Sequence, residues 1–253
     1  MSGKGPYRNV LVISDNPPQC VRFEETVRPV AEELGTRIGY ACSPWTPAEH
    51  FRTLGGKPVE VVDLKDEARV SDILSHYDLV ISMHCKQLFP PALVSGLKCI
   101  NIHPGYNPEN RGWYPQVFAI VNGGVIGATI HEIDLELDNG PIIARRLVEM
   151  LPTDTSLDVY ERVLDAEMEL LKENIRGILS GSYPVILPEH KGRLYLKKDF
   201  RNLCRIDLEE TGTFGQFIDR LRALSHGRFD NAFFVDEKTG EKIFVRIMLT
   251  RED

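Results

Sequence analysis

The sequence predicts an α/β fold: a mostly parallel sheet with helices on both faces, followed by a small C-terminal β-hairpin region. In the first part of the chain, short apolar runs rich in β-branched residues alternate with longer segments of helical periodicity. Such runs are typical of strands buried on both faces of a parallel sheet. The tail instead carries two strand-like runs around the turn sequence DEKTG at 236–240. We therefore expect a main domain over residues 1–185 and a smaller region over 186–253.

The first half of the chain reads as strands separated by helices. Residues 10–13, VLVI, form a wholly apolar run, and the helical pattern at 20–34 stops at Gly35. Residues 43–56 contain two prolines and a Gly-Gly pair, which favour a loop or short helix. The predicted elements are strands at 10–13, 37–42, 59–62, 78–83 and 97–102, and helices at 20–34 and 65–76.

The second half contains the longest helical pattern, at 156–179. Its apolar stripe, a cap at Asp154 or Thr155 and a stop at Gly181 predict a helix that packs on the sheet. A two-stranded hairpin alone is marginal in water, so the tail must pack on the main domain, on a second chain, or on both. The other predicted elements are helices at 114–121 and 213–224, and strands at 128–133, 141–150, 232–234 and 242–249.

Composition and charge exclude several classes of protein. With 253 residues, 42% of them hydrophobic, and a net charge of −7, the chain offers no basic face for nucleic acid. No window approaches the roughly 20 apolar residues of a membrane-spanning helix, and the N-terminus lacks a signal peptide. Five cysteines, an odd number without CxxC spacing, argue against a disulfide framework or a structural zinc site. We therefore expect a cytoplasmic protein with no membrane partner.

Polar residues follow the predicted strands, at the sheet edge where ligands of parallel α/β folds collect. Asn101 and His103 are two residues apart at the end of one strand, so their side chains point the same way. An amide can donate a hydrogen bond to a developing oxyanion, and an imidazole can accept or donate a proton near neutral pH. The pair is therefore a candidate catalytic site. The first strand exit lacks GxGxxG, so dinucleotide binding is not favoured.

Asp138 lies 35 residues after His103, in the sequence LDNG at 137–140. Alone it is well explained as a turn-forming aspartate. If its loop folds over the strand of Asn101 and His103, however, its carboxylate would orient the imidazole and stabilise the imidazolium. The sequence leaves both interpretations open.

These motifs resemble the folate-dependent formyltransferases. The resemblance rests on Asn-x-His at a strand end, Arg-Gly shortly after, and Asp-x-Gly further on. The strings SMHCKQLFP, NIHPGYNPENRGWYPQVFAI and GATIHEIDLELDNGPII are most similar to the sugar N-formyltransferases, and HKGRLYLKKDF and RLRALSHGRFDNAFF in the tail extend the likeness.

The resemblance implies a Rossmann-like catalytic domain over 1–185 that uses N10-formyltetrahydrofolate as co-substrate and no metal. Asn101, His103 and Asp138 map onto the catalytic set of the superfamily. The implied reaction formylates the 4-amino group of a nucleotide-linked dideoxy sugar, above all dTDP-4-amino-4,6-dideoxyglucose, in the biosynthesis of O-antigen lipopolysaccharide or another surface polysaccharide. Region 186–253 is then expected to make a homodimer through its hairpin.

Further residues near the strand exits are candidate contacts. Lys86 fits a diphosphate or a solvated surface, Arg111 fits a phosphate or a loop hydrogen bond, and Trp113 fits a pocket wall or the core. The cofactor-binding candidates are Met83, His84, Leu88 and Asp134. The substrate-binding candidates are Ser14, Asn16, Lys86, Gln87, Tyr106, Asn107, Arg111, Trp113 and Tyr114.

Three alternatives to this function remain open. One is a formyltransferase for another amino sugar, a dTDP-3-amino-3,6-dideoxyhexose or GDP-perosamine. A second is methionyl-tRNA as substrate, against which stand the acidic chain and its short tail. The third is a non-catalytic nucleotide-sugar binding protein, which would not need Asn101, His103 and Asp138 together.

Overall fold

A computed structural model describes residues 5–51, 54, 56 and 58–252. Its centre is a seven-stranded sheet in the order β3-β2-β1-β4-β5-β7-β8. The five strands from β3 to β5 are parallel, whereas β7 runs antiparallel to β5, and β8 to β7. The bounds are β1 Asn9–Ser14, β2 Arg37–Cys42, β3 Glu60–Val61, β4 Leu79–Met83, β5 Lys98–His103, β7 Ile126–Glu132 and β8 Ile142–Val148. The predicted mostly parallel α/β fold is confirmed.

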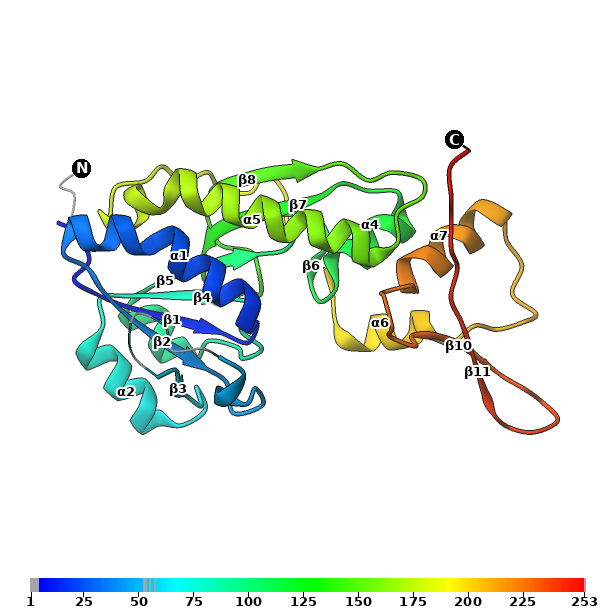
Figure 1. Cartoon of the computed structure of the whole chain (residues 1–253), viewed down its shortest axis with the longest axis horizontal. Coiled ribbons are helices and arrows are strands. Elements are labelled where there is room, and N and C mark those ends of the chain that lie inside the picture. The colour runs from blue at the N-terminus through cyan, green and yellow to red at the C-terminus, as the bar shows by residue number, and fades with distance from the viewer. Residues whose placement is uncertain (1–4, 52–53, 55, 57, 253) are drawn as a thin grey trace.

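Helices cover both faces of this sheet (Figure 1). Alternate residues of β1 enter different apolar clusters: Val10 and Val12 join the larger one, and Leu11 and Ile13 the smaller one. Helices α1 (Pro17–Leu34) and α5 (Ser156–Leu179) supply the larger cluster, and α2 (Glu67–His76) the smaller. The alternation of a strand buried on both sides thus produces two cores, one on each face.

Several element ends differ from the sequence prediction for local reasons. Helix α1 begins at Pro17, three residues early, because the side chain of Asn16 accepts a hydrogen bond from Gln19 N and proline suits the first helical turn. The last strand, β11 (Lys242–Val245), is four residues shorter than predicted. The short helices α3 (Pro91–Gly96) and α6 (Lys197–Cys204) were not predicted, since each spans at most about two turns.

The loop predicted over 43–56 is described only in part. It contains a single 3-10 turn, η1 (Ala48–His50), and residues 52, 53, 55 and 57 lie outside the described residues. Trp45, in the described part of this loop, is 55% exposed.

The part of the chain from α6 onward lies beside α4 (Pro115–Asn122), at one end of the molecule (Figure 1). Strand β9 (Leu194–Tyr195) pairs with β6 (Arg111–Gly112), and α7 (Phe214–Leu224) packs on α4. The hairpin of β10 (Ala232–Val235) and β11 buries Ala232 and leaves Phe244 about half exposed. Within the described ranges, no helix is long and apolar enough to cross a membrane.

Candidate active site

The structure brings Asn101, His103 and Asp138 together. Asn101 Nδ2 donates a hydrogen bond to Asp138 Oδ1 at 3.1 Å, and Asp138 Oδ2 lies 3.7 Å from His103 Nδ1. Asn101 and His103 leave the sheet on β5, while Asp138 comes from the loop that joins β7 to β8. The loop folds back over the end of β5, so the carboxylate reaches both side chains.

The turn at Asp138 is what places its carboxylate. Asp138 has φ of +49°, a left-handed conformation that aspartate tolerates. Its Oδ2 accepts a hydrogen bond from Gly112 N at 3.1 Å, and its main-chain oxygen accepts one from Asn107 Nδ2 at 3.0 Å. The buried Arg111 donates to Leu137 O at 2.9 Å, on the residue before it. Asp138 therefore both forms the turn and contacts Asn101, so the two interpretations left open by the sequence are compatible.

His131 is a second imidazole in the site that the sequence analysis did not identify. It stands opposite Asn101 in the β5–β7 pairing, is 1% exposed, and its Nε2 lies 3.3 Å from Asn101 Nδ2. Its Nδ1 lies 2.7 Å from Glu132 O, so Nδ1 carries the proton and Nε2 accepts from Asn101. A histidine inside the otherwise apolar strand β7 could have drawn attention in the sequence. That it faces Asn101, however, depends on the register between β5 and β7.

The combined effects of burial and charge lower the pKa values of both His103 and Asp138. Burial lowers the pKa of His103 below its ordinary value, and the attraction of Asp138 offsets this only in part. Burial also opposes ionisation of Asp138, but attraction to His103 and His131 and the hydrogen bond from Gly112 hold its pKa well below the usual range. At neutral pH the site therefore holds a neutral imidazole beside an anionic carboxylate.

The Nε2 nitrogen of His103 can act as a proton acceptor. With Nδ1 facing Asp138, the lone pair lies on Nε2, which is buried and has no hydrogen-bond partner among the described residues. Gly105 lies against this nitrogen, and a Cβ at that position would overlap Nε2. Any larger residue at position 105 would therefore displace the imidazole of His103.

Some residues predicted to contact ligands instead form hydrogen bonds to other parts of the protein with their side chains. The amide of Gln87 accepts from Leu64 N and donates to Val62 O, both at 2.8 Å, which is a structural role. Asn107 and Arg111 hold the Asp138 loop, so of the two roles open to Arg111 the structure shows the loop hydrogen bonds. The remaining buried candidates are Met83, in the core, and Ser14, which is hydrogen-bonded to Asn16.

The other candidates lie at the surface or in aromatic contacts. Lys86 is exposed, and its main-chain N donates to Asp15 Oδ2 at 2.6 Å. Tyr106 lies under Arg145 at 4.7 Å, Trp113 under Lys197 at 3.9 Å, and Tyr114 against Phe200 at 4.1 Å. Leu88 is 75% exposed, and Asp134 accepts from Glu136 N at 2.9 Å.

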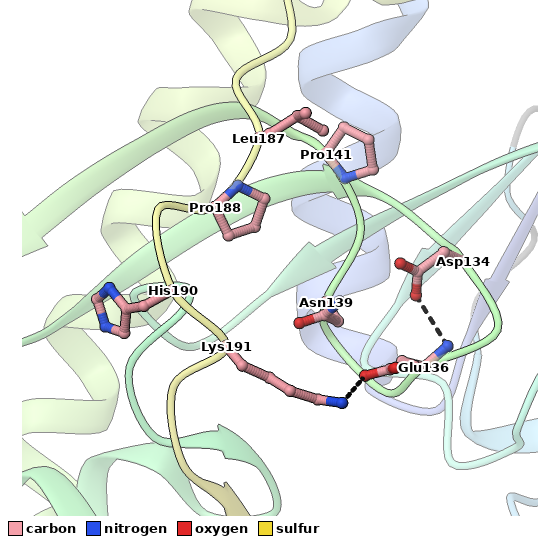
Figure 2. A pocket seen from close by; sticks show the side chains of 8 residues that line it. All are labelled: Asp134, Glu136, Asn139, Pro141, Leu187, Pro188, His190 and Lys191. Carbon is pink, nitrogen blue, oxygen red and sulfur yellow. Dashed lines mark hydrogen bonds and ion pairs between the residues drawn. The ribbon is translucent and has the colours of Figure 1, made fainter.

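A cavity of about 490 Å³ borders the outer side of the Asp138 loop (Figure 2). Figure 2 shows Lys191 reaching across it to Glu136, with 2.7 Å between Lys191 Nζ and Glu136 Oε2. Asn101, His103 and Asp138 do not line this cavity. At this cavity the segment leading to the tail contacts the Asp138 loop.

The described residues hold no group of three His, Cys, Asp or Glu side chains placed to bind a metal ion. The expectation of a reaction without metal stays a prediction.

Comparison with known proteins assigns both parts of the chain to families. Residues 8–175 match the family described as "Formyl transferase", and residues 199–251 match "N-formyltransferase dimerization C-terminal domain". The chain is 54% identical over 184 residues to a dTDP-4-amino-4,6-dideoxyglucose formyltransferase of Mycobacterium tuberculosis, a match that covers 73% of this chain and 78% of the relative.

Solved structures agree over nearly the whole length. A sugar N-formyltransferase from a Shewanella species superposes with a TM-score of 0.89 at 38% identity, covering 97% of this chain and 99% of the other. A 4-N formyltransferase from Francisella tularensis gives 0.88 at 36% identity with the same coverage. The chain therefore belongs to the formyl transferase family and, within it, to the sugar N-formyltransferases.

Proposed function

We propose that this enzyme moves a formyl group from N10-formyltetrahydrofolate to the 4-amino group of a nucleotide-linked dideoxy sugar, most closely dTDP-4-amino-4,6-dideoxyglucose. The observation that carries the proposal is the contact of Asn101 and His103 with Asp138, which leaves His103 Nε2 free. The names of the relative at 54% identity and of the Francisella structure support the choice of sugar and of its 4-nitrogen. The reaction fits cytoplasmic synthesis of O-antigen or another surface polysaccharide.

In this proposal each residue has one task. His103 Nε2 accepts a proton from the ammonium form of the sugar amine, and the lone pair freed on nitrogen attacks the formyl carbon. As the bond from that carbon to N10 of the folate breaks, the sugar nitrogen loses a second proton and N10 gains one. Asp138 stabilises the imidazolium that results. Asn101 Nδ2 exchanges its longer hydrogen bond, 3.3 Å to His131, for one to the formyl oxygen as negative charge develops there.

The loops after β4 and β7 offer apolar side chains to a flat aromatic ring system such as that of the folate. Leu88 and Leu135 are 75% and 71% exposed, and their neighbours Phe89 and Ile133 pack in the same apolar cluster. When bound, the folate supplies the formyl carbon. We propose that these leucines border it together with the predicted Met83, His84 and Asp134. His84 would do so through its backbone, because its imidazole is bonded to Glu167.

We propose that the nucleotide part of the sugar substrate lies near Lys86 and the aromatic residues that follow β5. Lys86 is exposed and supplies a charge for the diphosphate. Tyr106, Trp113 and Tyr114 supply faces for stacking, and Asn16 leads out of the neighbouring strand β1.

The decisive experiment offers the purified enzyme formyl-folate and a panel of nucleotide-linked amino sugars. We expect dTDP-4-amino-4,6-dideoxyglucose to gain the mass of one formyl group by mass spectrometry. Preferred turnover of the 3-amino sugar or of GDP-perosamine would reassign the substrate. No product with any amino sugar would contradict the enzymatic proposal and favour the binding protein.

We also propose that residues 1–185 carry catalysis and that residues 186–253 form a homodimer through the β10–β11 hairpin. The match to a dimerization domain over 199–251 supports this. So do the exposed apolar side chains of this region, which a monomer would leave in water. They include Phe214, Phe229, Ile243, Phe244 and Met248.

Phe244→Lys is expected to shift the protein from dimer to monomer, because it places a charge on the exposed face of the hairpin. Light scattering after size-exclusion chromatography measures the mass. Val61→Lys, at an exposed apolar residue of the edge strand β3, is the matched control and should stay dimeric. A Phe244→Lys protein that remains fully dimeric at low micromolar concentration would locate the interface elsewhere.

A further inference from the structure

A second polar cluster lies at the carboxyl edge of the sheet, centred on Glu167 in the middle of α5. Glu167 is 0% exposed and projects from the apolar face of the helix. His84 Nε2 lies 2.8 Å from its Oε2, and Gln19 Nε2 donates to the same oxygen at 3.2 Å. A fully buried carboxylate is costly without partners, so its retention calls for a reason.

The other carboxylate oxygen is open. Glu167 Oε1 is buried and has no hydrogen-bond partner among the described residues. A neutral His84 satisfies the rest of the cluster. His84 donates from Nε2 to Glu167 and accepts at Nδ1 from the hydroxyl of Tyr160, 3.4 Å away. In this arrangement no donor of the cluster reaches Glu167 Oε1, which remains a free acceptor.

His84, which holds the carboxylate, follows β4 next to the strand end that carries the catalytic imidazole. In the parallel pairing of β4 with β5, Met83 stands opposite Ile102, so His84 and His103 are the next residues on neighbouring strands. Such strands lie about 4.8 Å apart. His84 has φ of +56°, which turns the chain here and lets its side chain meet α5. Burial lowers the pKa of His103 most strongly, but the negative charge of Glu167 raises it, which agrees with this placement.

The site thus offers two buried acceptors of different character, neither of which has a hydrogen-bond partner within the described part of the chain: the anionic Glu167 Oε1 and the neutral His103 Nε2. A primary amine arrives in neutral water as an ammonium ion with three N–H bonds. An anion attracts it, and a neutral base is needed to remove one proton before the nitrogen can attack. The two acceptors match those two needs.

We propose that Glu167, oriented by His84, binds the ammonium group of the acceptor sugar while His103 Nε2 removes one of its protons. The inference rests on the proposed function and adds the group that selects an amine over a hydroxyl. The N–H bond to His103 breaks, its electron pair stays on nitrogen as the attacking lone pair, and the proton passes to Nε2. Glu167 keeps its hydrogen bond to a remaining N–H and gains no proton.

Glu167→Gln tests this assignment, because it keeps the shape of the side chain and removes the charge. Calorimetry would compare the binding of the 4-amino sugar nucleotide and of its 4-hydroxy analogue. We expect wild type to favour the amine by about tenfold to a hundredfold, the range of hydrogen bonds to charged groups, and Glu167→Gln to bind both alike. The KM for formyl-folate should stay unchanged.

Two further variants keep the test decisive. His84→Asn tolerates the left-handed backbone and should lose part of the amine preference. Glu167→Asp keeps the charge but moves it back by one methylene, so it should also lose part of the amine preference. This variant serves as the test if Glu167→Gln does not fold. Glu24→Gln, at a buried carboxylate on α1 that lies 3.7 Å from Arg28, is the control and should keep the full preference.

The outcomes separate this inference from the proposed function. If wild type formylates an amino sugar and folded Glu167 variants keep the amine preference, Glu167 is only a structural residue and the inference is wrong. In that case only the melting temperature would change. If wild type formylates no amino sugar at all, the proposed function itself fails.

Discussion

His103→Ala is expected to lower kcat by about 10²–10⁴-fold, the usual contribution of a positioned general base. The reason is geometric: Nε2 is the buried, unpartnered nitrogen, and Nδ1 faces Asp138. Single-turnover formylation measures the loss. Circular dichroism should show an unchanged fold, because alanine leaves no new buried donor or acceptor on its own side chain.

The matched control for this variant is His76→Ala. His76 is a surface histidine on α2 with a carboxylate neighbour, Asp72, and its side chain is 67% exposed. It should retain full activity. A folded His103→Ala enzyme with wild-type turnover would assign the proton transfer to another group.

The pH dependence of kcat/KM should follow the same imidazole. Burial lowers the pKa of His103 below its ordinary value of 6.5, so the base is already unprotonated at neutral pH. Activity should therefore stay level from pH 8 down to about 6.5 and fall only below it, as His103 gains its proton. An acidic limb centred above pH 7 would contradict this environment for His103.

Asp138→Asn is expected to cost activity and stability together. Two donors point at the carboxylate, Asn101 Nδ2 at one oxygen and Gly112 N at the other. An asparagine offers one acceptor oxygen and one donor group, so one of the two bonds must be lost. Leaving a buried donor unsatisfied costs about 1–3 kcal/mol of unfolding free energy. The imidazolium of His103 also loses its counter-charge, so we expect turnover to fall at least about a hundredfold.

Denaturant unfolding and steady-state kinetics measure the two effects. Without the attraction of Asp138, which raises the pKa of His103, the acidic limb of the pH profile should move to lower pH. Asp66→Asn is the control: Asp66 caps α2 by accepting from Ala68 N at 2.9 Å, and asparagine can accept the same bond. If Asp138→Asn keeps both stability and turnover, the carboxylate neither holds the loop nor assists His103.

Contacts between residues close in the sequence could be predicted, whereas contacts between distant segments could not. Asn101 and His103 could be paired from the sequence, because residues two apart in a strand share a face. Gln87 and Arg111 could be placed near the strand exits, but whether each faced a ligand or the loops required the hydrogen bonds themselves. The helix α6 escaped prediction because it is only eight residues long and lies in a basic run.

The sequence by itself determined the alternation of strands and helices, the two-sided burial of β1 and the common direction of Asn101 and His103. These are local properties, set by periods of two and 3.6 residues. Only the tertiary structure decided that Asp138 reaches Asn101, that His131 stands opposite Asn101 and that Glu167 meets His84. Those contacts join residues 37, 30 and 83 positions apart, and they depend on strand register and helix packing, which no local pattern encodes.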